Sequence, residues 1–530
     1  MDFKKDIIRN STVFLAVSSI FSQILGFVRD KLLSHMYGAG FFLDSYYAAF
    51  RVPEFMYLSI GSFVSSAILV PLFSKKLYDE DRVIYFQKLC TTFIVFFVVT
   101  YGVVVLFLPK IINILYGHMD PLFQKSIVLY GSILLVSTFF LSLSSVISSV
   151  AQQKRKFIYV GIAPILYNLG TVIGIVVLRP YWGIVGVCIG VVLGSLLHLL
   201  VQLPIVIKLG LFENYGKFIL KSFSFSLLKN TLSKSFLRTL SLIFSAVTFF
   251  LLTYFASSYE VGSITVISLA FTLQTVFHTI LGVSYATTIF PLLSDAFVAE
   301  DDLLFDSIIA HGFKKIFLIS IVFTALVVLF RFEIVHILFG SGNFTNADVI
   351  LTAAALGIFI ISLYAQNAIL LISRASYAKG DYVLPLVTNI MSAILFFIFA
   401  ILLSISKFDL YYNVLSVPIA YSLSQYIALG VAFIIYRKNK IVKSPYLGLS
   451  YMFKISITTL ITVISCRYVL YLMLMGQNSM ILHILYSFFV FIFFIFSTYV
   501  LLGLFKDVNI IENRIEAKNL FNKISLALWR

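Results

Sequence analysis

Apolar residues occur in long runs along this chain, and short polar segments separate the runs. Runs such as 93–107 and 488–504 are apolar on every helical face and lack the alternation of a strand, which indicates helices. A helix needs about 20 apolar residues to cross a bilayer. The pattern predicts fourteen spanning helices, at 11–36, 43–74, 85–115, 122–150, 157–178, 183–208, 236–256, 262–294, 312–339, 349–374, 383–405, 410–436, 451–475 and 480–505.

Composition agrees with this pattern. The 530 residues are 60% hydrophobic and only 12% charged, and the mean hydropathy is +1.02. A soluble domain is about 25% charged, and a disordered chain has low hydrophobicity, so both classes are excluded. We expect an all-α polytopic membrane protein.

The basic N-terminus before the first run resembles a signal peptide, but the run is long and lacks a small-residue cleavage site, so we interpret it as the first span.

The net charge of +16 follows from the position of the cations. Most of the 39 Lys and Arg lie at the N-terminus, in alternate gaps between spans and at the C-terminus. Cations of the opposite gaps are few: Lys110, Lys125, Arg179, Arg331 and Lys407. This asymmetry predicts an even number of spans with both termini in the cytoplasm. The charge therefore reflects orientation in a membrane, and we expect no nucleic-acid partner.

Short motifs recur in the same order at an offset of 220–223 residues, which indicates an internal duplication. The pairs are Tyr37-x-x-Gly40 with Tyr259-x-x-Gly262, Pro71-Leu72-x-Ser74 with Pro291-Leu292-x-Ser294, Ile114–Gly117 with Ile337–Gly340, and Pro164-x-x-x-Asn168 with Pro385-x-x-x-Asn389. Each copy holds six helices, so both copies have the same orientation, as in transporters built from parallel repeats.

The repeat predicts how the chain is divided. Residues 1–208 would form an N-terminal six-helix lobe, 209–235 a basic amphipathic linker on the cytoplasmic surface, and 236–436 a C-terminal six-helix lobe. Residues 437–505 would carry two helices outside the repeat, and 506–530 a cytoplasmic tail.

Ionisable side chains inside spans are costly, so each is a candidate functional group. Arg29 and Asp30 lie in the first span, and Asp44, Tyr47, Arg51 and Glu54 share one face of the second. A guanidinium stays charged and binds phosphate through two donors, so Arg29 and Arg51 predict a phosphate-bearing substrate. The alternative is local pairing, of Arg29 with Asp30 or Asp44 and of Arg51 with Glu54. We expect Asp30 and Asp44 to orient the arginines or to serve as ion or proton sites.

The matching helix of the second repeat carries hydroxyls instead of charges: Ser268, Thr272, Thr275 and Thr279. Such hydroxyls often bond to their own backbone. We interpret nearby His278, and the scattered Cys90, Cys188 and Cys466, as packing residues. No Gly-rich phosphate loop, metal-ligand spacing or large extramembrane region occurs. These features predict a transporter rather than an enzyme, without a cofactor, driven by a coupling ion or the membrane potential.

Two groups of residues resemble a known family. The first is Gln23-Ile-Leu-Gly-Phe-Val-Arg-Asp30, Tyr37-Gly-Ala-Gly40, Asp44 and Ala49-Phe-Arg-Val-Pro53; the second is Ile337–Phe344, Asp348 and Ser373–Asp381 followed by Pro385. In this order they resemble the MurJ/MviN lipid II flippases of the multidrug/oligosaccharidyl-lipid/polysaccharide exporter superfamily, whose members have fourteen helices.

The resemblance implies a V-shaped central cavity between two lobes, with the last two helices forming a groove for a polyprenyl tail. The implied activity is translocation of the undecaprenyl-pyrophosphate-linked peptidoglycan precursor across the bacterial cytoplasmic (inner) membrane by alternating access, for cell-wall synthesis and cell shape. Implied partners are this precursor, membrane lipids and cell-wall synthesis proteins. Arg29, Asp30, Asp44, Arg51 and the position of Thr272 are the implied substrate-binding residues.

The chain departs from the family pattern at several cavity positions. Gln23 and Thr272 stand where the family has Arg, Tyr57 stands near another basic position, Ser62 and Phe63 replace a Glu-Gly pair, and Glu54 replaces Asn. Each lost charge-assisted contact weakens an anion site by roughly 1.5–3 kcal/mol. A flippase for another polyprenyl-linked glycan, such as an O-antigen or capsule unit, therefore stays open.

Two further classes are less favoured. A drug or ion antiporter of the same superfamily would need only twelve spans. A membrane glycosyltransferase would need a large outer loop with acidic or His groups, and the sequence contains none.

Overall fold

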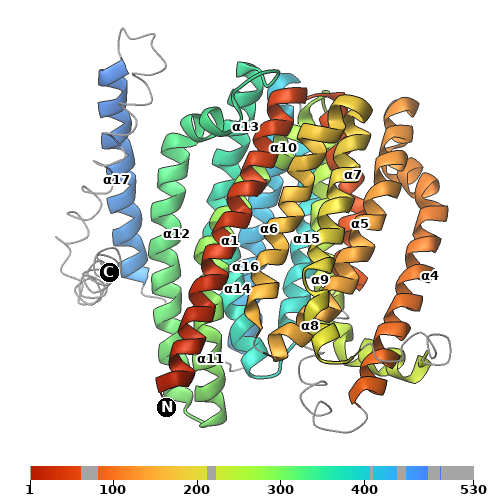
Figure 1. Cartoon of the computed structure of the whole chain (residues 1–530). Coiled ribbons are helices and arrows are strands. Elements are labelled where there is room, and N and C mark those ends of the chain that lie inside the picture. The colour runs from red at the N-terminus through yellow and green to blue at the C-terminus, as the bar shows by residue number, and fades with distance from the viewer. Residues whose placement is uncertain are drawn as a thin grey trace. The chain divides into compact units, whose positions relative to one another are not determined.

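The computed structural model describes residues 2–60, 82–154, 156–211, 223–405, 410–438 and 449–474, together with residues 490 and 494. Within these residues every regular element is a helix, which confirms the all-α prediction (Figure 1). The α-helices are α1 (Asp2–Tyr37), α2 (Phe41–Ile60), α4 (Arg82–Tyr116), α5 (Pro121–Gln153), α6 (Phe157–Ile173), α7 (Arg179–Leu200), α8 (Leu203–Lys208), α9 (Phe225–Ser257), α10 (Ser263–His278), α11 (Ser284–Val298), α12 (Asp302–Phe339), α13 (Asn346–Phe359), α14 (Leu363–Ala378), α15 (Val383–Ile405), α16 (Ser416–Lys438) and α17 (Leu449–Leu474).

Short π- and 3₁₀-helices join several of these elements. The π-helices are η2 (Gly174–Leu178) and η5 (Thr279–Val283), and the 3₁₀-helices are η6 (Ile360–Ser362) and η7 (Leu410–Leu415). In the described part of the chain, nine helical stretches are long and apolar enough to span a membrane. The second half of the predicted span 43–74 and most of the span 480–505 lie outside the described residues.

The hydrophobic pattern locates the apolar part of each span well. The predicted span 157–178 corresponds to α6 with η2, and 383–405 corresponds to α15. Several helices begin earlier than predicted, and in two of them a polar cap sets the first turn. Ser224 Oγ accepts a hydrogen bond from Leu227 N (3.3 Å), so α9 begins inside the predicted linker. Asp301 Oδ1 likewise accepts from Leu304 N (2.9 Å) at the start of α12.

The helices divide into two compact units. Unit 1 comprises Met1–Thr272, His336–Ala355 and Tyr382–Ala428, and unit 2 comprises Leu273–Val335, Leu356–Asp381 and Leu429–Arg530. The predicted lobe boundaries stay a prediction.

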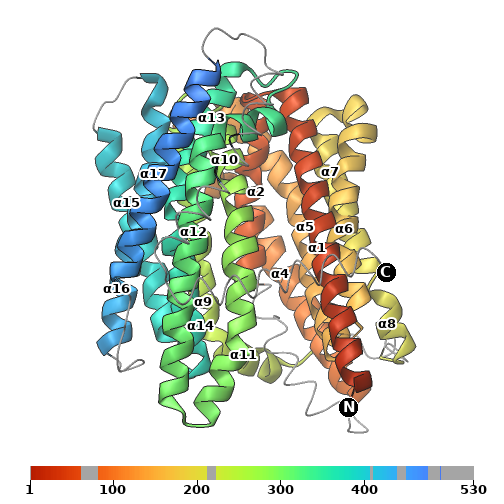
Figure 2. The ribbon, with the colours of Figure 1, turned by 90° about the vertical axis from the view of Figure 1, so that its left-hand side faces the viewer.

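The duplication is visible inside unit 1 as one hydrogen-bond arrangement that occurs twice. Asn168 Nδ2 on α6 donates to the carbonyl and hydroxyl oxygens of Ser22 on α1, both at 3.0 Å. Asn389 Nδ2 on α15 donates to the same two atoms of Ser241 on α9, at 3.1 and 2.9 Å. Figure 2 shows α1 beside α6. The two Pro-x-x-x-Asn motifs therefore have the same role in their respective repeats.

In unit 1, glycines allow α6 and η2 to approach α7 closely. A Cβ added at Gly190 would overlap the backbone of Gly174, and one at Gly170 would overlap Gly194. The hydrophobic effect does not drive helices together in lipid, because lipid tails are as apolar as the side chains. Close van der Waals packing is therefore a main source of helix–helix association.

In unit 2, the helix predicted as the first of the extra pair packs on α12. Cys466 of α17 is fully buried against Leu329 and Phe330 of α12, and Val490 and Phe494 belong to the same cluster. Cys466 is thus a packing residue, as predicted.

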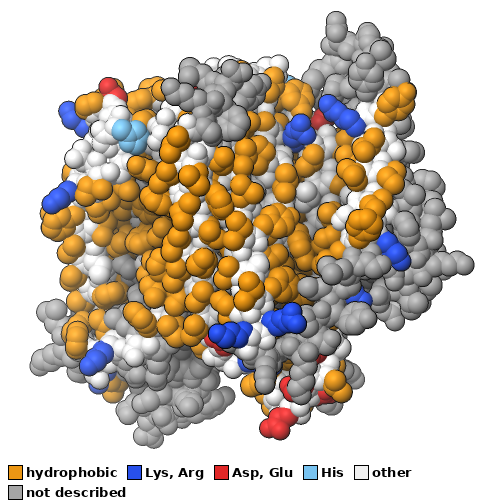
Figure 3. Space-filling view, turned by 180° about the vertical axis from the view of Figure 1, so that it is seen from behind, with side chains coloured by type: hydrophobic (Ala, Val, Ile, Leu, Met, Phe, Trp, Pro, Cys, Tyr) orange, Lys and Arg blue, Asp and Glu red, His pale blue; other side chains and the backbone are white. Residues whose placement is uncertain are grey.

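The outer surface is apolar. Leu106 is 78% exposed and Ile405 is 71% exposed. Figure 3 shows one face on which hydrophobic side chains cover the middle, while most of the visible Lys and Arg lie toward its upper and lower margins. An apolar surface of this kind suits contact with lipid tails rather than water.

Replacing Gly190 by Ala should destabilise the fold, because the new methyl group must separate α7 from η2. Overpacking of this kind costs about 1–3 kcal/mol. The midpoint of thermal unfolding in detergent should fall clearly for Gly190→Ala. Gly102→Ala is the matched control, since a Cβ there meets nothing within 4 Å; equal midpoints for the two variants would contradict the packing argument.

Candidate functional site

The predicted site residues lie on α1, α2 and α10 within unit 1, and α9 adds Thr253, which the sequence did not predict. Helices α1 and α2 come from the first repeat and carry the charged residues, while α9 and α10 come from the second repeat and carry hydroxyls. The structure brings Arg51 to both α9 and α10, pairs Arg29 with its sequence neighbour, and places Asp44 at the start of α10.

Arg51 connects the two repeats. Its Nε donates to Thr253 Oγ1 on α9 (2.5 Å), and its Nη2 donates to Ser268 Oγ on α10 (3.3 Å). Its Nη1 donates to Glu54 Oε2 (2.9 Å), the local pair that the sequence suggested. Within the described part of the chain these bonds use three of the five N–H donors of the guanidinium, which leaves one hydrogen on each terminal nitrogen for an anion.

Arg29 has more unused donors. Its Nε donates to Asp30 Oδ1 at 2.8 Å, and within the described residues its two terminal nitrogens make no hydrogen bond. The Arg29 side chain is 25% exposed, whereas that of Asp30 is 3% exposed. Asp30 therefore holds the guanidinium in place on one edge, and the opposite edge stays available to a ligand.

Asp44 makes a different set of contacts from the one that the sequence suggested. Its Oδ2 accepts from Gly262 N (2.6 Å), and its Oδ1 accepts from the backbone N (2.7 Å) and Oγ1 (2.6 Å) of Thr265. The carboxylate thus caps the start of α10, where backbone N–H groups lack partners and the helix dipole favours a negative charge. Asp44 links α2 of the first repeat to α10 of the second.

Thr272 makes a local bond. Its Oγ1 donates to the carbonyl oxygen of Ser268 at 2.8 Å, within α10. Ser268, one turn earlier, is the residue of this helix that contacts Arg51. The second repeat therefore supplies a hydroxyl, not a charge, to the arginine.

Tyr47 belongs to this group as well; the sequence placed it on the polar face of the second span but not among the substrate-binding residues. It lies on α2 between Asp44 and Arg51 and interacts electrostatically with Arg29, Asp30 and Arg51. Its hydroxyl is buried and has no hydrogen-bond partner within the described residues. The signal was its spacing on the charged face of α2, at i+3 from Asp44 and i−4 from Arg51.

Near Asp44, the end of α1 is tied to the segment 337–343 of the second repeat. Lys31 Nζ donates to the Ile337 carbonyl (2.9 Å), and His35 Nδ1 lies 3.1 Å from Ser341 Oγ. Asn343 Nδ2 donates to the Met36 carbonyl (2.7 Å). We call these contacts, with those of Asp44, the α1–α2 latch. The latch joins the two repeats at one end of unit 1.

In unit 2, His278 has the packing role that the sequence favoured. Its Nδ1 lies 2.7 Å from Asn367 Oδ1, and Asn367 Nδ2 donates to Ser320 Oγ (3.0 Å). Since that carbonyl oxygen can only accept, His278 Nδ1 is the donor. Among the described residues, no group of three His, Cys, Asp or Glu is placed to hold a metal ion.

These features define the class of protein: a polytopic helical membrane transporter with an internal duplication and two partly buried arginines, of which Arg51 connects the two repeats. The chain belongs to the MurJ lipid II flippase family, because the model of that family, described as lipid II flippase MurJ, matches residues 33–500. This membership confirms the predicted family and identifies the chain as a transporter rather than an enzyme.

Relatives and solved structures agree. The chain is 25% identical over 437 residues to a probable lipid II flippase MurJ of Borreliella burgdorferi, covering 81% of this chain and 83% of the relative. It is 24% identical over 374 residues to the lipid II flippase MurJ of Burkholderia cenocepacia, covering 69% and 72%. Its fold resembles a lipid II flippase MurJ in an inward closed conformation, with a TM-score of 0.75, 21% identity and coverage of 93% and 100%. A multidrug MATE transporter in an inward-facing conformation is more distant, with a TM-score of 0.65, 15% identity and coverage of 81% and 98%.

Replacing Asp44 by Asn should loosen the start of α10, because a neutral amide forms weaker bonds to the backbone N–H groups than a carboxylate does. Hydrogen–deuterium exchange of peptides that cover residues 258–270 should become faster, with the amides of Gly262 and Thr265 losing most protection. Ser45→Ala is the control, since Ser45 Oγ donates within its own helix to the Phe42 carbonyl. Unchanged exchange in the Asp44 variant would show that its carboxylate does not hold this turn.

Proposed function

We propose that this protein translocates lipid II, the undecaprenyl-pyrophosphate-linked peptidoglycan precursor, across the bacterial cytoplasmic membrane by alternating access. The observation that carries the proposal is the pair of partly buried arginines on α1 and α2, both with N–H donors left over, in a member of the lipid II flippase family. A pyrophosphate is the part of such a substrate that a guanidinium recognises best.

In this mechanism, Arg29 receives the anion first. It has a free edge, and Asp30 keeps it oriented without covering that edge. The polyprenyl tail remains in lipid, because its transfer from lipid into water would be costly.

Arg51 then couples binding to movement of the repeats. Its bonds to the neutral hydroxyls of Thr253 and Ser268 are weaker than bonds to phosphate oxygens, so a pyrophosphate can replace them. Once they are replaced, α2 is no longer held to α9 and α10 through this side chain. Substrate binding thereby lowers the free energy needed to separate the repeats, as alternating access requires.

The proposal also covers the orientation of the chain in the membrane, the energy source of transport and the binding partners. The distribution of Lys and Arg supports cytoplasmic termini. We assign the driving force to a coupling ion or the membrane potential, with no bound cofactor. Membrane lipids and cell-wall synthesis proteins are the proposed additional partners.

Cells depleted of their own lipid II flippase should be rescued by the wild-type chain and not by Arg29→Ala or Arg51→Ala, at equal protein levels. Loss of the charge removes the charge-assisted bonds to pyrophosphate, each of roughly 1.5–3 kcal/mol. Lys125→Ala, which changes an exposed cation of α5, should rescue normally. Full rescue by both arginine variants would show that the anion is bound elsewhere.

A second candidate function has its own supporting observation. Thr272 stands where the family has Arg, and its hydroxyl bonds to its own helix. This position therefore offers no cation to the headgroup, which favours a different polyprenyl-linked glycan as substrate. Rescue of a surface-glycan defect, together with failure to rescue peptidoglycan synthesis, would favour this candidate and contradict the first.

Alternating access also requires the α1–α2 latch to open. In the double variant His35→Cys/Ser341→Cys, a short bifunctional thiol reagent should cross-link the two positions, because the native side chains are within hydrogen-bond distance. The native Cys90, Cys188 and Cys466 are buried and should react little. Cross-linking should abolish transport in vesicles, and a reagent with a cleavable disulfide should allow recovery on reduction. Each single-cysteine variant is the control, and full transport by the cross-linked protein would exclude opening at this end.

A further inference from the structure

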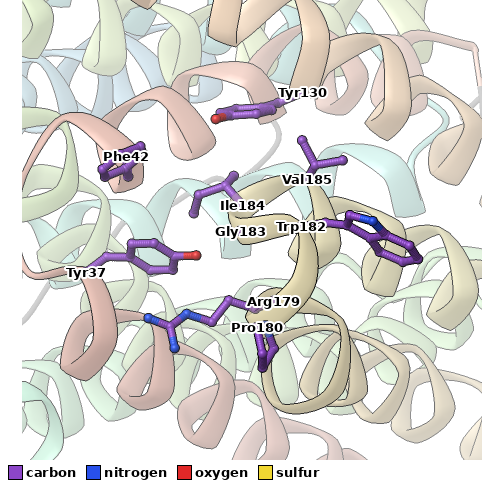
Figure 4. A pocket seen from close by; sticks show the side chains of 9 residues that line it. All are labelled: Tyr37, Phe42, Tyr130, Arg179, Pro180, Trp182, Gly183, Ile184 and Val185. Atoms are coloured by element: carbon purple, nitrogen blue, oxygen red, sulfur yellow. The ribbon is translucent and has the colours of Figure 1, made fainter.

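A cavity of about 510 Å³ lies within unit 1, and neither Arg29 nor Arg51 lines it. Its lining residues come from the end of α1, the start of α2, the middle of α5 and the start of α7 (Figure 4). They are Tyr37, Phe42, Tyr130, Arg179, Pro180, Trp182, Gly183, Ile184 and Val185.

The local backbone creates this space. Pro180 follows the π-helix η2, and Gly183 has a φ of +57°, a conformation that suits glycine and interrupts the helix. Nothing lies within 4 Å of a Cβ built at Gly183. The turn leaves Tyr181 80% exposed and Trp182 56% exposed.

The cavity contains one charge, and that charge is positive. The Arg179 guanidinium carbon lies 5.2 Å from the centre of the Tyr37 ring, so the ring covers one face of the guanidinium. None of the lining residues is acidic, and within the described residues Arg179 forms no ion pair. In Figure 4 the Tyr37 ring lies beside the guanidinium. The Tyr37 hydroxyl is buried; it makes no hydrogen bond of good geometry within the described residues, and it lies close enough to the Arg179 side chain to interact with it. The N–H donors on the edge of the guanidinium and this hydroxyl are thus available to one anion.

The surroundings of the cavity are those of a membrane interface. Exposed Trp and Tyr side chains are typical of the headgroup level of a bilayer, and Tyr181 and Trp182 fit this pattern. Val176 and Val177, in η2, are 54% and 52% exposed. They offer an apolar surface for acyl chains next to the cationic cavity.

We propose that this cavity binds the headgroup of an anionic glycerophospholipid, with Arg179 and the Tyr37 hydroxyl on its phosphate and the acyl chains against η2. A phosphate diester has the charge and the acceptor oxygens that a guanidinium edge requires. The site is separate from the proposed substrate site and would be filled by a lipid of the membrane itself.

The chain carries its own reporter for a test. It has two tryptophans, Trp182 and Trp529, so the variant Trp529→Phe leaves fluorescence from the cavity wall alone. The full-length protein is placed in phosphatidylcholine nanodiscs that contain a minor fraction of lipid brominated on the acyl chain near the headgroup. The brominated lipid is either phosphatidylglycerol or phosphatidylcholine, and bromine quenches Trp182 only at short range.

We expect brominated phosphatidylglycerol to quench Trp182 at a fraction of about one tenth of that needed for phosphatidylcholine. Both lipids have a phosphate, but the choline cation of phosphatidylcholine would lie near Arg179 with no acidic lining residue to pair with it. Arg179→Gln should remove this preference, and Arg179→Lys should retain part of it. Lys125→Gln, which changes another cation of unit 1, should retain all of it. An unchanged emission maximum in unbrominated nanodiscs shows that each variant is folded.

Three outcomes would overturn the proposal. They are equal quenching by the two lipids, a preference that persists in Arg179→Gln, and complete loss of the preference when inorganic phosphate is added at constant ionic strength. The last would mean that the cavity takes a free anion rather than a lipid. None of these outcomes depends on lipid II transport, so the proposal can fail while the proposed function stands.

Discussion

A polar group inside a bilayer has no water to bond to, so its partners must come from the protein, and this constraint organises unit 1. Asp44 finds its partners at the start of α10, and Arg51 finds its partners on α9 and α10. In both cases a charged group of the first repeat is bonded to neutral groups of the second, and Arg51 also pairs with Glu54 of its own helix. The charges that a membrane makes expensive are therefore the contacts that hold the two repeats together.

The two arginines differ in which of their present contacts would break when an anion binds. Arg29 is paired on one edge with Asp30 and can accept an anion without breaking another contact between helices. Arg51 cannot bind a phosphate through all its donors without releasing a hydroxyl of α9 or α10. One arginine is thus suited to recognition, and the other to coupling recognition with a change of conformation.

Close backbone packing gives each repeat the rigidity that such coupling needs. Glycines bring α6 and η2 against α7, and an asparagine fixes α6 to α1. The second repeat uses an asparagine in the same way between α15 and α9. In lipid, where neighbouring helices gain little from hydrophobic burial, these short contacts determine which helices stay together.

The sequence alone determined the helical class, the extent of most spans and the duplication. Spans are readable because the length of an apolar run is a local property matched to bilayer thickness. The local pair Arg51–Glu54 was readable because residues three apart lie on the same face of a helix. For Arg29 the sequence left Asp30 and Asp44 as alternatives, and the structure shows the pair with Asp30. The start of α9 was misjudged because a single serine cap, not hydrophobicity, sets it.

Only the tertiary structure decided the partners of Asp44 and the partners of Arg51 outside its own helix. Thr253, Gly262, Thr265 and Ser268 lie more than 200 residues away in sequence, and hydroxyls and backbone N–H groups are too common along the chain for a pattern to single them out. The cavity at Arg179 was hidden for the same reason, because its wall is assembled from four helices. Local hydrophobicity fixes where a chain enters and leaves the membrane, whereas the pairing of its few polar groups depends on how the helices pack.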